Sequence, residues 1–311
     1  MIRALKDRSQ ISTLNEHYRS IPPIIAFSNK HFYDDDLKVM TARPDDNTQG
    51  LYWIQCQGKR IKDGTNPKEA DKLIETIAAI IKEEQQLSDT TCSSLGILSP
   101  FRAQVELLSA LVVQQFSLEQ IQKHHLSVGT AYSFQGEERD LMFLSFALDK
   151  DSHSAAFRHL NKADVFNVSI TRARKGQYLF CSLTANQLPI DALLRAYLSF
   201  KPKQQSIKKN KFSDTFLIEI ITLLKSLNIQ HYWKGYHLAG TLIELLIKKN
   251  MHYIAIDLIG YPGMFSEAYG TERYRVLHRA GINTFPIAYS DWCFDRATVE
   301  EQLKTYLDTF H

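Results

Sequence analysis

The sequence predicts an α/β protein whose first 200 residues form a parallel β-sheet flanked by helices. Three observations lead to this prediction. Helical patterns alternate with short apolar runs along residues 1–200. Several of these runs are apolar throughout, as strands covered on both faces are. The chain has 311 residues, a length that suits two domains, each burying its own core.

The elements of the first domain, 1–200, follow from their local patterns. The helix expected over 67–86 has the clearest start, because Thr65 or Asn66 can cap it. Pro67 suits its first turn, and Glu69 follows near the N-terminus. The other expected helices are 22–32 and 101–115, and the expected strands are 51–56, 95–99, 126–130, 141–146 and 178–183.

A basic linker and a second, smaller domain follow. Residues 201–212, KPKQQSIKKNKF, contain five lysines and no acid, and they show no periodicity. Residues 213–311 predict the order helix, strand, strand, helix, strand. Ser213 or Asp214 can cap the first of these helices, and Gly281 closes the second. These elements are expected at 213–228, 242–247, 253–259, 271–281 and 284–292.

Composition excludes several classes of protein. The apolar content of 44% and charged content of 23% are typical of soluble globular proteins. The net charge of +3 is too small to indicate nucleic-acid binding by itself. The four cysteines stand singly without zinc-ligand spacing, which favours a cytoplasmic location over a disulfide framework. No apolar run reaches about 18 residues and no signal-peptide pattern opens the chain, so no membrane partner is expected.

Four segments of the first domain form the most specific pattern in the sequence. They are LNEHYRSIPPIIAFSNKHFYDDDL (14–37), GILSPFRAQVELL (96–108), SVGTAYSFQGEERDLMFLSF (127–146) and FNVSITRARKG (166–176). In order and spacing they resemble motifs IV, IVa, V and VI of superfamily 1 helicases, most closely the Upf1-like, 5′-to-3′ translocating branch. The resemblance covers roughly residues 10–185 and implies the second RecA-like domain of the motor.

Arg172 and Arg174 lie between an apolar helical run and a strand. On a helix their side chains would point about 200° apart, so one could pair structurally while the other reaches an anion. Both could instead be solvated at a helix C-terminus. The helicase resemblance implies that Arg172 and Arg19 are catalytic arginine fingers for a departing γ-phosphoryl group, which leaves Arg174 in the structural pair. The alternative for Arg19 is a surface ion pair with Glu16.

The same resemblance implies further contacts with the nucleotide. Tyr18 is expected to bind it beside the first finger. Gln135, Gly136 and Glu138 are expected to form the loop that senses the nucleotide, with Glu138 near the ribose or phosphates and counted as catalytic. Gly136 would let the backbone come close to a ligand. Tyr132 departs from the family pattern, which usually has an aspartate there, and a plain surface turn is the alternative for this loop.

Nucleic-acid contacts are implied at two other places. Thr130 and Ser133 are expected near the nucleic-acid backbone. Ser99 and Pro100 lie where a strand gives way to a helix N-terminus, and hydroxyl and N–H groups at such a place suit a phosphate. The family commonly has threonine where this chain has Ser99. For Phe101 both a core position and a base-stacking role are open.

The sequence contains no GxxxxGK[ST] pattern and no acidic strand ahead of the first motif. The fingers therefore need a nucleotide that is held elsewhere. We expect the chain to be the C-terminal part of a larger helicase, whose N-terminal RecA-like lobe binds ATP and Mg²⁺. Alone, the chain is expected neither to hydrolyse ATP nor to unwind a duplex.

Residues 213–311 resemble restriction-endonuclease-like domains of the Vsr or DUF559 type through GTLIELLI, YIAIDLIG, TERYRVLHRAGI and IAYSDW. The resemblance implies catalytic, metal-binding carboxylates at Glu244 and Asp257, which would hold Mg²⁺ or Mn²⁺. The family expects a polar residue where this chain has Ile259.

An active nuclease and a degenerate DNA-binding or structural domain both remain open for this region. Glu244 and Asp257 lie in apolar runs, where an unpaired acid is unfavourable, so they predict either a metal or a buried basic partner. Arg273 and Arg275 are the candidates for that partner. Glu267 or Glu272 could supply a third metal ligand.

The sequence as a whole predicts the C-terminal fragment of an ATP-dependent DNA helicase with an appended nuclease-like domain. DNA is preferred over RNA only because of the endonuclease resemblance. Two alternatives from other classes are a non-catalytic nucleic-acid-binding or docking module and a free-standing metal-dependent nuclease. Arg19, Glu138 and Arg172 favour the helicase, because an inactive lobe has no need of them.

Overall fold

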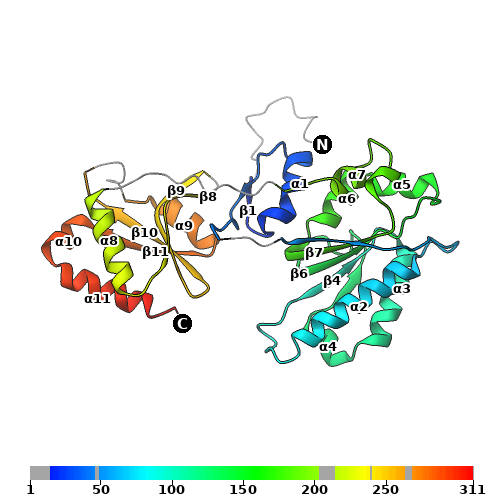
Figure 1. Cartoon of the computed structure of the whole chain (residues 1–311), viewed down its shortest axis with the longest axis horizontal. Helices are drawn as coiled ribbons and strands as arrows, with labels where there is room; N and C mark the ends of the chain where they lie inside the picture. The colour runs from blue at the N-terminus through cyan, green and yellow to red at the C-terminus, as the bar shows by residue number, and fades with distance from the viewer. Residues whose placement is uncertain (1–14, 46–48, 203–213, 239, 263–267, 311) are drawn as a thin grey trace. The chain divides into compact units, whose positions relative to one another are not determined.

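A computed structural model describes residues 15–45, 49–202, 214–238, 240–262 and 268–310. Figure 1 shows two groups of helices and strands, which correspond to two compact units. We call them the parallel-sheet unit (Arg19–Leu37 and Asn47–Lys203) and the mixed-sheet unit (Met1–Tyr18, Lys38–Asp46 and Gln204–His311). The short segments 15–18 and 38–45 thus belong with the C-terminal part of the chain. The domain limits 1–200, 201–212 and 213–311 stay a prediction, and most of the proposed linker lies outside the described residues.

The parallel-sheet unit contains five strands, all parallel, in the order β3-β7-β6-β4-β5. The predicted α/β class, with its parallel sheet flanked by helices, is therefore confirmed. The strands are β3 (Leu51–Gln55), β4 (Leu95–Leu98), β5 (Ser127–Gly129), β6 (Arg139–Ser145) and β7 (Ala173–Cys181). The helices are α1 (Pro22–Phe32), α2 (Pro67–Glu83), α3 (Arg102–Gln115), α4 (Leu118–Lys123), α5 (Ser154–Leu160), α6 (Ala163–Ile170) and α7 (Leu193–Leu198), with the 3₁₀ turn η3 (Ala185–Gln187).

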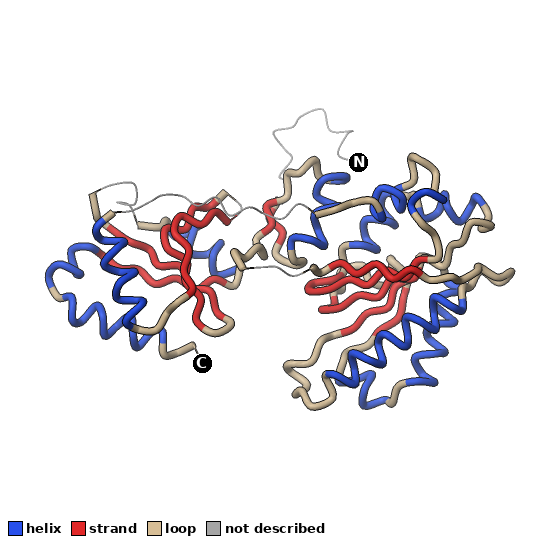
Figure 2. Tube along the Cα trace, viewed as in Figure 1, coloured by secondary structure: helices blue, strands red, loops and turns tan. Residues whose placement is uncertain are grey.

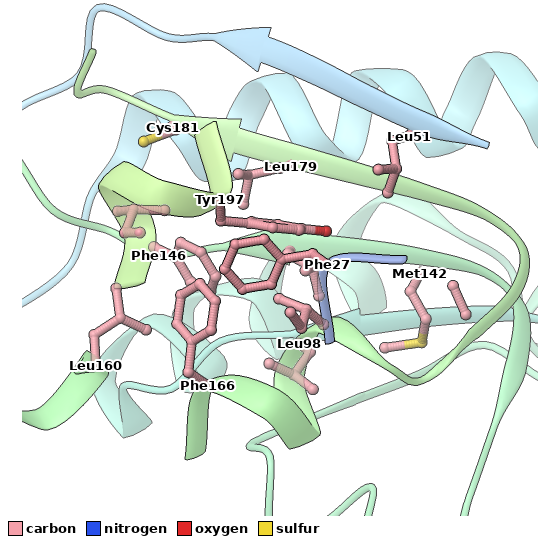
Figure 3. Packing of buried hydrophobic residues seen from close by; sticks show 14 of the residues in the cluster. Phe27, Leu51, Leu98, Met142, Phe146, Leu160, Phe166, Leu179, Cys181 and Tyr197 are labelled. Carbon is pink, nitrogen blue, oxygen red and sulfur yellow. The ribbon is translucent and has the colours of Figure 1, made fainter. Parts of the chain in front are cut away.

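Helices cover both faces of this sheet, as the apolar strands predict (Figure 2). Side chains alternate along β6, so Met142 and Leu144 enter one core cluster while Phe143 enters the other. Helices α1, α6 and α7 close the first cluster, where Phe27 lies 4.8 Å from Tyr197 between ring centroids (Figure 3). Helices α2 and α3 close the second.

Local signals explain the best-predicted boundaries. The side chain of Asn66 caps α2 by accepting from the backbone N–H of Glu69, and Pro67 opens its first turn. Helix α1 spans the predicted 22–32. Strand β7 begins at Ala173, five residues before the predicted 178, because its first residues pair with β6 from Arg139 onward. Arg174 therefore lies on a strand, and the helical angle assumed for Arg172 and Arg174 was wrong.

The mixed-sheet unit contains a four-stranded sheet in the order β11-β10-β9-β8, in which only β10 and β11 are parallel. The strands are β8 (His231–Leu238), β9 (Thr241–Lys249), β10 (His252–Ile259) and β11 (Ile282–Ala288). The helices are α8 (Thr215–Ser226), α9 (Thr271–Arg279), α10 (Tyr289–Phe294) and α11 (Arg296–Leu307), and Glu16–His17 (β1) and Lys38–Val39 (β2) form a separate parallel pair.

Two core clusters cover opposite faces of the mixed sheet. One joins α8 and α11 to the sheet. The other contains Met40 and Ala42, which pack with Leu246, Leu277 and Ile282. Segment 38–45 is thus part of this core.

The predicted strand 284–292 ends early, because the chain turns into α10. This turn buries Trp292, whose indole N–H donates to a carboxylate oxygen of Glu219 over 2.8 Å. Asp214, one of the two predicted caps, accepts from the N–H of Leu217 and caps α8. Ser213, the other, lies outside the described residues.

Candidate functional site

Three predicted residues meet where β6 and β7 begin. Glu138 and Arg172 directly precede these strands, and the N–H of Arg139 donates to the carbonyl of Arg172 over 3.1 Å. Arg19 precedes α1 and is held beside them by its neighbour Ser20, whose hydroxyl donates to the carbonyl of Ala173 over 2.7 Å. Segments far apart in the sequence therefore bring the two predicted fingers and the predicted acid together.

Glu138 lies between two arginines in this cluster. Arg19 Nε is 2.5 Å from Glu138 Oε2, and Arg174 lies 3.6 Å from Glu138 Oε1. The Arg19 and Glu138 side chains are 32% and 35% exposed, so a ligand can reach them. Glu16, the alternative partner for Arg19, accepts from the hydroxyl of Tyr18 within its own unit.

Arg172 is more buried than Arg19 and Glu138, and its Nε donates to the carbonyl of Val168 over 3.1 Å. Burial lowers the pKa of Arg172, and the positive charge of Arg19 lowers it further. An added anion would relieve this repulsion, because the cluster holds more positive than negative charge. Its chemistry therefore suits a phosphate group.

Arg174 forms the structural pairing expected of it. Its Nε lies 3.4 Å from Asp140 Oδ1, and Asp140 also accepts from the backbone N–H and the hydroxyl of Ser94. Lys175 approaches the same carboxylate at 3.2 Å. These hydrogen bonds and cations lower the pKa of Asp140 although burial opposes them.

Tyr18 belongs to the mixed-sheet unit and contacts two residues of that unit. Its hydroxyl donates to Glu16 Oε2 over 2.6 Å, and the guanidinium carbon of Arg279 lies 4.5 Å from its ring centroid. Burial and the hydrogen bond to Glu16 raise the pKa of Tyr18 to about 12. A role for Tyr18 in binding nucleotide stays a prediction.

The loop from 130 to 138 runs from one end of the sheet to the other. Gly129 and Leu144 both pair with Leu98, so the chain leaves β5 at the level of Leu144 and re-enters the sheet at Arg139. This displacement is five residues, or roughly 16 Å along a strand. The buried ring of Phe134 fixes the middle of the loop.

Gln135 and Gly136, the predicted nucleotide sensors, are exposed on this loop. Gly136 has φ +88°, a conformation that favours glycine, and no atom lies within 4 Å of where a Cβ would be. Thr130 and Ser133 lie near the opposite end of the loop, with their hydroxyl oxygens 3.2 Å apart. The loop thus connects the predicted nucleic-acid contacts to the arginine cluster.

Ser99 and Thr130 follow neighbouring strands at the same edge of the sheet. The N–H of Ser99 donates to the carbonyl of Gly129 over 3.1 Å, and the Ser99 hydroxyl accepts from the N–H of Phe101 over 3.3 Å. Ser99 and Pro100 are buried, and no side chain caps the first turn of α3. Nucleic-acid binding by these residues stays a prediction.

Phe101 is half-buried, and a cation covers its ring. The guanidinium carbon of Arg60 lies 4.2 Å from the ring centroid, while His159 packs against the ring at 5.7 Å. The contact between Arg60 and Phe101 was missed from the sequence. The only signal for it was the run of cations in GKRIKDG, residues 58–64.

Glu244 and Asp257 lie directly opposite each other on neighbouring strands of the mixed sheet. Leu245 pairs with Ile256, so Glu244 and Asp257 occupy the next position along this antiparallel ladder. Both are buried, with exposures of 2% and 0%. They point to the face that Leu246 also covers.

Neighbouring residues already donate hydrogen bonds to one oxygen of each carboxyl. Asp257 Oδ2 accepts from the Tyr274 hydroxyl over 2.6 Å and from the N–H of Tyr269 over 3.0 Å. Glu244 Oε2 accepts from the N–H of Leu258 over 2.8 Å. Burial raises the pKa of Asp257, and it raises that of Glu244 to about 8.

Arg273 is the basic residue whose charge acts on this pair, and it lowers the pKa of both carboxyls. Its guanidinium stacks 3.6 Å from the Tyr269 ring centroid. Arg275 is not the partner, because it is exposed and lies 3.9 Å from Glu272. Asp257 Oδ1 and Arg273 Nε are buried without a hydrogen-bond partner.

The two carboxyls do not form a complete metal site with their described neighbours. Among the described residues, no group of three or more histidine, cysteine, aspartate or glutamate side chains could hold a metal ion. Ile259 offers no ligand, Glu272 is exposed, and Glu267 lies outside the described residues. Binding of Mg²⁺ or Mn²⁺ by Glu244 and Asp257 stays a prediction.

The family described as "AAA domain" (AAA_12) matches residues 1–184. A relative named "Putative helicase mov-10-B.1" from Danio rerio is 25% identical over 193 residues, 54% of this chain and 19% of the relative. "DNA polymerase alpha-associated DNA helicase A" from Saccharomyces cerevisiae is 27% identical over 198 residues, 56% of this chain and 28% of the relative. "Regulator of nonsense transcripts 1 homolog" from Arabidopsis thaliana is 26% identical over 179 residues, 52% of this chain and 14% of the relative.

These alignments span less than a third of each curated relative. A crystal structure of the C-terminal domain of a possible DNA helicase from Lactobacillus plantarum WCFS1 is 12% identical, with a TM-score of 0.32, and covers 53% of this chain and 86% of that one. Within the part of the chain that the structure describes, no helix is both long and apolar enough to cross a membrane.

Proposed function

The chain belongs to the AAA domain family AAA_12, and from this premise we propose that the parallel-sheet unit is the second RecA-like lobe of a superfamily 1 helicase motor. The observation that carries the proposal is the cluster of Arg19, Glu138 and Arg172 at one edge of the sheet. Three separate segments supply these side chains, with Arg19 paired to the partly exposed Glu138 and Arg172 within range of both charges, although one surface ion pair contributes little to stability. Such an arrangement serves an anionic ligand better than it serves the fold.

In this function Arg19 and Arg172 act on the γ-phosphoryl group of an ATP molecule that another lobe binds together with Mg²⁺. Their charges stabilise the negative charge that develops as the phosphoryl group leaves. Glu138 holds Arg19 in place until the nucleotide arrives. The greater length of the curated relatives supports a lobe in the same polypeptide that supplies the phosphate-binding loop.

We also propose a nucleic-acid contact at the opposite end of the sheet, where β4 and β5 finish. The residues that would bind the backbone of a single strand there are Ser99, Pro100, Thr130 and Ser133. The loop 130–138 would then join nucleic-acid binding to the arginine cluster. One relative is named as a DNA helicase. DNA remains the proposed substrate, and RNA is the alternative that the binding experiment distinguishes.

The experiment measures two properties of this chain alone. We expect a labelled single-stranded oligonucleotide to bind, Thr130→Ala to weaken that binding several-fold, and ATP turnover to be absent. DNA and RNA oligonucleotides of equal length identify the preferred strand. Steady ATP turnover that disappears in Arg172→Ala would contradict the need for a second lobe.

For the mixed-sheet unit we propose a nuclease-like module that has kept its acidic pair but grips nucleic acid or supports the fold rather than cutting. The hydrogen bonds from Tyr269 and Tyr274 to Asp257 favour this role over an active metal site. Single- and double-stranded DNA incubated with Mg²⁺ or Mn²⁺ should remain intact. Cleavage that is lost in Asp257→Ala would make the chain a nuclease instead.

A further inference from the structure

A short basic loop connects β3 to α2, and none of the helicase motifs includes it. Residues 57–64, QGKRIKDG, contain three cations and one acid, a net charge of +2. Lys59 and Lys62 are exposed, and Ile61 between them is 49% exposed. We call this segment the basic loop.

The basic loop is held in one conformation by bonds to its surroundings. The N–H of Gly58 donates to the Ser182 hydroxyl over 3.2 Å, and the N–H of Arg60 donates to Asp149 Oδ2 over 2.9 Å. The Arg60 guanidinium also donates to the carbonyl of Ala147 over 2.7 Å. The loop is therefore attached to the segments that follow β6 and β7.

A buried polar network lies beneath the loop and fixes its base. Glu69 is completely buried and accepts from the hydroxyls of Ser145 and Ser182 and from the N–H of Ala147, all within 2.9 Å. At Gly58 an added Cβ would lie 2.0 Å from Asn66 Oδ1, so only glycine fits. This order fixes the backbone that carries the two exposed lysines, which lowers the backbone entropy lost when they bind.

The loop lies beside the predicted nucleic-acid edge. Arg60 stacks on Phe101, the residue after Ser99 and Pro100. A Cβ at Gly64 would lie 3.8 Å from the Cβ of Ala103 in the first turn of α3. No side chain caps that turn. The positive end of the helix dipole and the positive charge of the loop therefore both favour an anion there.

We propose that the basic loop is a further nucleic-acid contact, in which Lys59 and Lys62 bind consecutive phosphates of a single strand passing the start of α3. Arg60 is a positioning residue, because its guanidinium is engaged with Phe101 and Ala147. The two nearby acids, Asp63 and Asp149, keep their negative charge, but the three cations of the loop outnumber them. The inference rests on the proposed nucleic-acid binding of the parallel-sheet unit.

The test compares the unchanged chain with Lys59→Ala/Lys62→Ala and with the matched control Lys72→Ala/Lys82→Ala on α2. Both variants lose two exposed lysines from the same unit. Fluorescence anisotropy with labelled 20-nucleotide dT and rU oligomers gives Kd over a range of salt concentrations. Far-ultraviolet circular dichroism confirms that the variants fold.

In the loop variant, Kd should rise about tenfold for any base sequence, and the slope of log Kd against log salt should fall by about 1.4, or 0.7 per phosphate contact. In the control variant, Kd and the salt slope should each change by less than half of these amounts. Equal behaviour of the two variants, with the unchanged chain still binding, would overturn the loop inference alone. Failure of the unchanged chain to bind either oligomer would overturn the proposed nucleic-acid function and the loop inference together.

Discussion

The two acidic clusters of this chain contain similar groups in opposite environments. Glu138 lies 35% exposed beside Arg19, whereas Glu244 and Asp257 are buried, with exposures of 2% and 0%, near Arg273. Burial raises the pKa of both carboxyls in the second cluster, and backbone and tyrosine donors occupy them. The partly exposed cluster can exchange its internal ion pair for a ligand. In the buried cluster, the carboxyls already accept hydrogen bonds from their own unit.

The largest stability effect is expected at Asp257. Asp257→Ala leaves the Tyr274 hydroxyl and the Tyr269 N–H without their acceptor and removes a carboxyl on which the charge of Arg273 acts. Losing one side of such a buried charged group should lower the free energy of unfolding by about 3 to 5 kcal/mol. Urea denaturation of the whole chain measures this. A loss below about 1 kcal/mol would mean that the second cluster is as open as the first.

Met40→Ala tests whether segment 38–45 covers the buried carboxyls. Met40 is 1% exposed and packs on the face of the mixed sheet that carries Glu244 and Asp257. The cavity should cost about 2 to 4 kcal/mol. Hydrogen exchange should show lost protection in β9 and β10. Loss confined to the parallel sheet would instead assign segment 38–45 to that unit.

Glu244 should make stability depend on pH. Its pKa is about 8 in the fold and 4.5 ordinarily, so between these values the folded state binds more protons than the unfolded state. The contribution is fully present below pH 4.5 and is lost as pH rises toward 8. Glu244→Gln should reduce the fall in unfolding free energy between pH 5 and pH 8 by about 1 to 3 kcal/mol. An identical pH profile in the variant would refute a protonated Glu244.

The smallest effect is expected in the exposed cluster. Glu138→Gln removes the partner of Arg19 and one partner of Arg174, but solvent reaches all three side chains. The unfolding free energy should change by less than about 1 kcal/mol, because water replaces the lost ion pair. Thermal denaturation of Glu138→Gln and Asp257→Ala, measured side by side, compares the two losses of stability directly. A loss as large as that of Asp257→Ala would remove the distinction between the clusters.

Patterns of a few residues predicted much of the fold. Apolar runs located all five parallel strands, and Asn66 with Pro67 set the start of α2. Strand β8 was missed because its sequence, HYWKGYHL, mixes polar and aromatic residues without a long apolar run. Segment 38–45 was not linked to the C-terminal part, because the burial of Met40 and Ala42 depends on contacts distant in sequence.

The candidate site, like the fold, was predicted only in part. Motif order placed Arg19, Glu138 and Arg172 in one function, but the register of β7 decided that Arg174 joins Asp140 and Glu138. The donors to Asp257 could not be predicted, because Tyr269 and Tyr274 reach it through the placement of α9. Arg60 was missed because its role depends on Phe101, which approaches it only in the folded chain.

The proposed role of Arg172 is tested most directly by ATP hydrolysis stimulated by single-stranded nucleic acid, measured in a polypeptide that also contains the proposed ATP-binding lobe. Arg172→Ala should lower turnover by about a thousandfold, while Arg174→Ala stays within tenfold of the unchanged protein. Arg172→Lys, which keeps the charge but not the planar fork, should also be strongly impaired. Full turnover in folded Arg172→Ala would show that Arg172 has no part in the reaction and would contradict its role as an arginine finger.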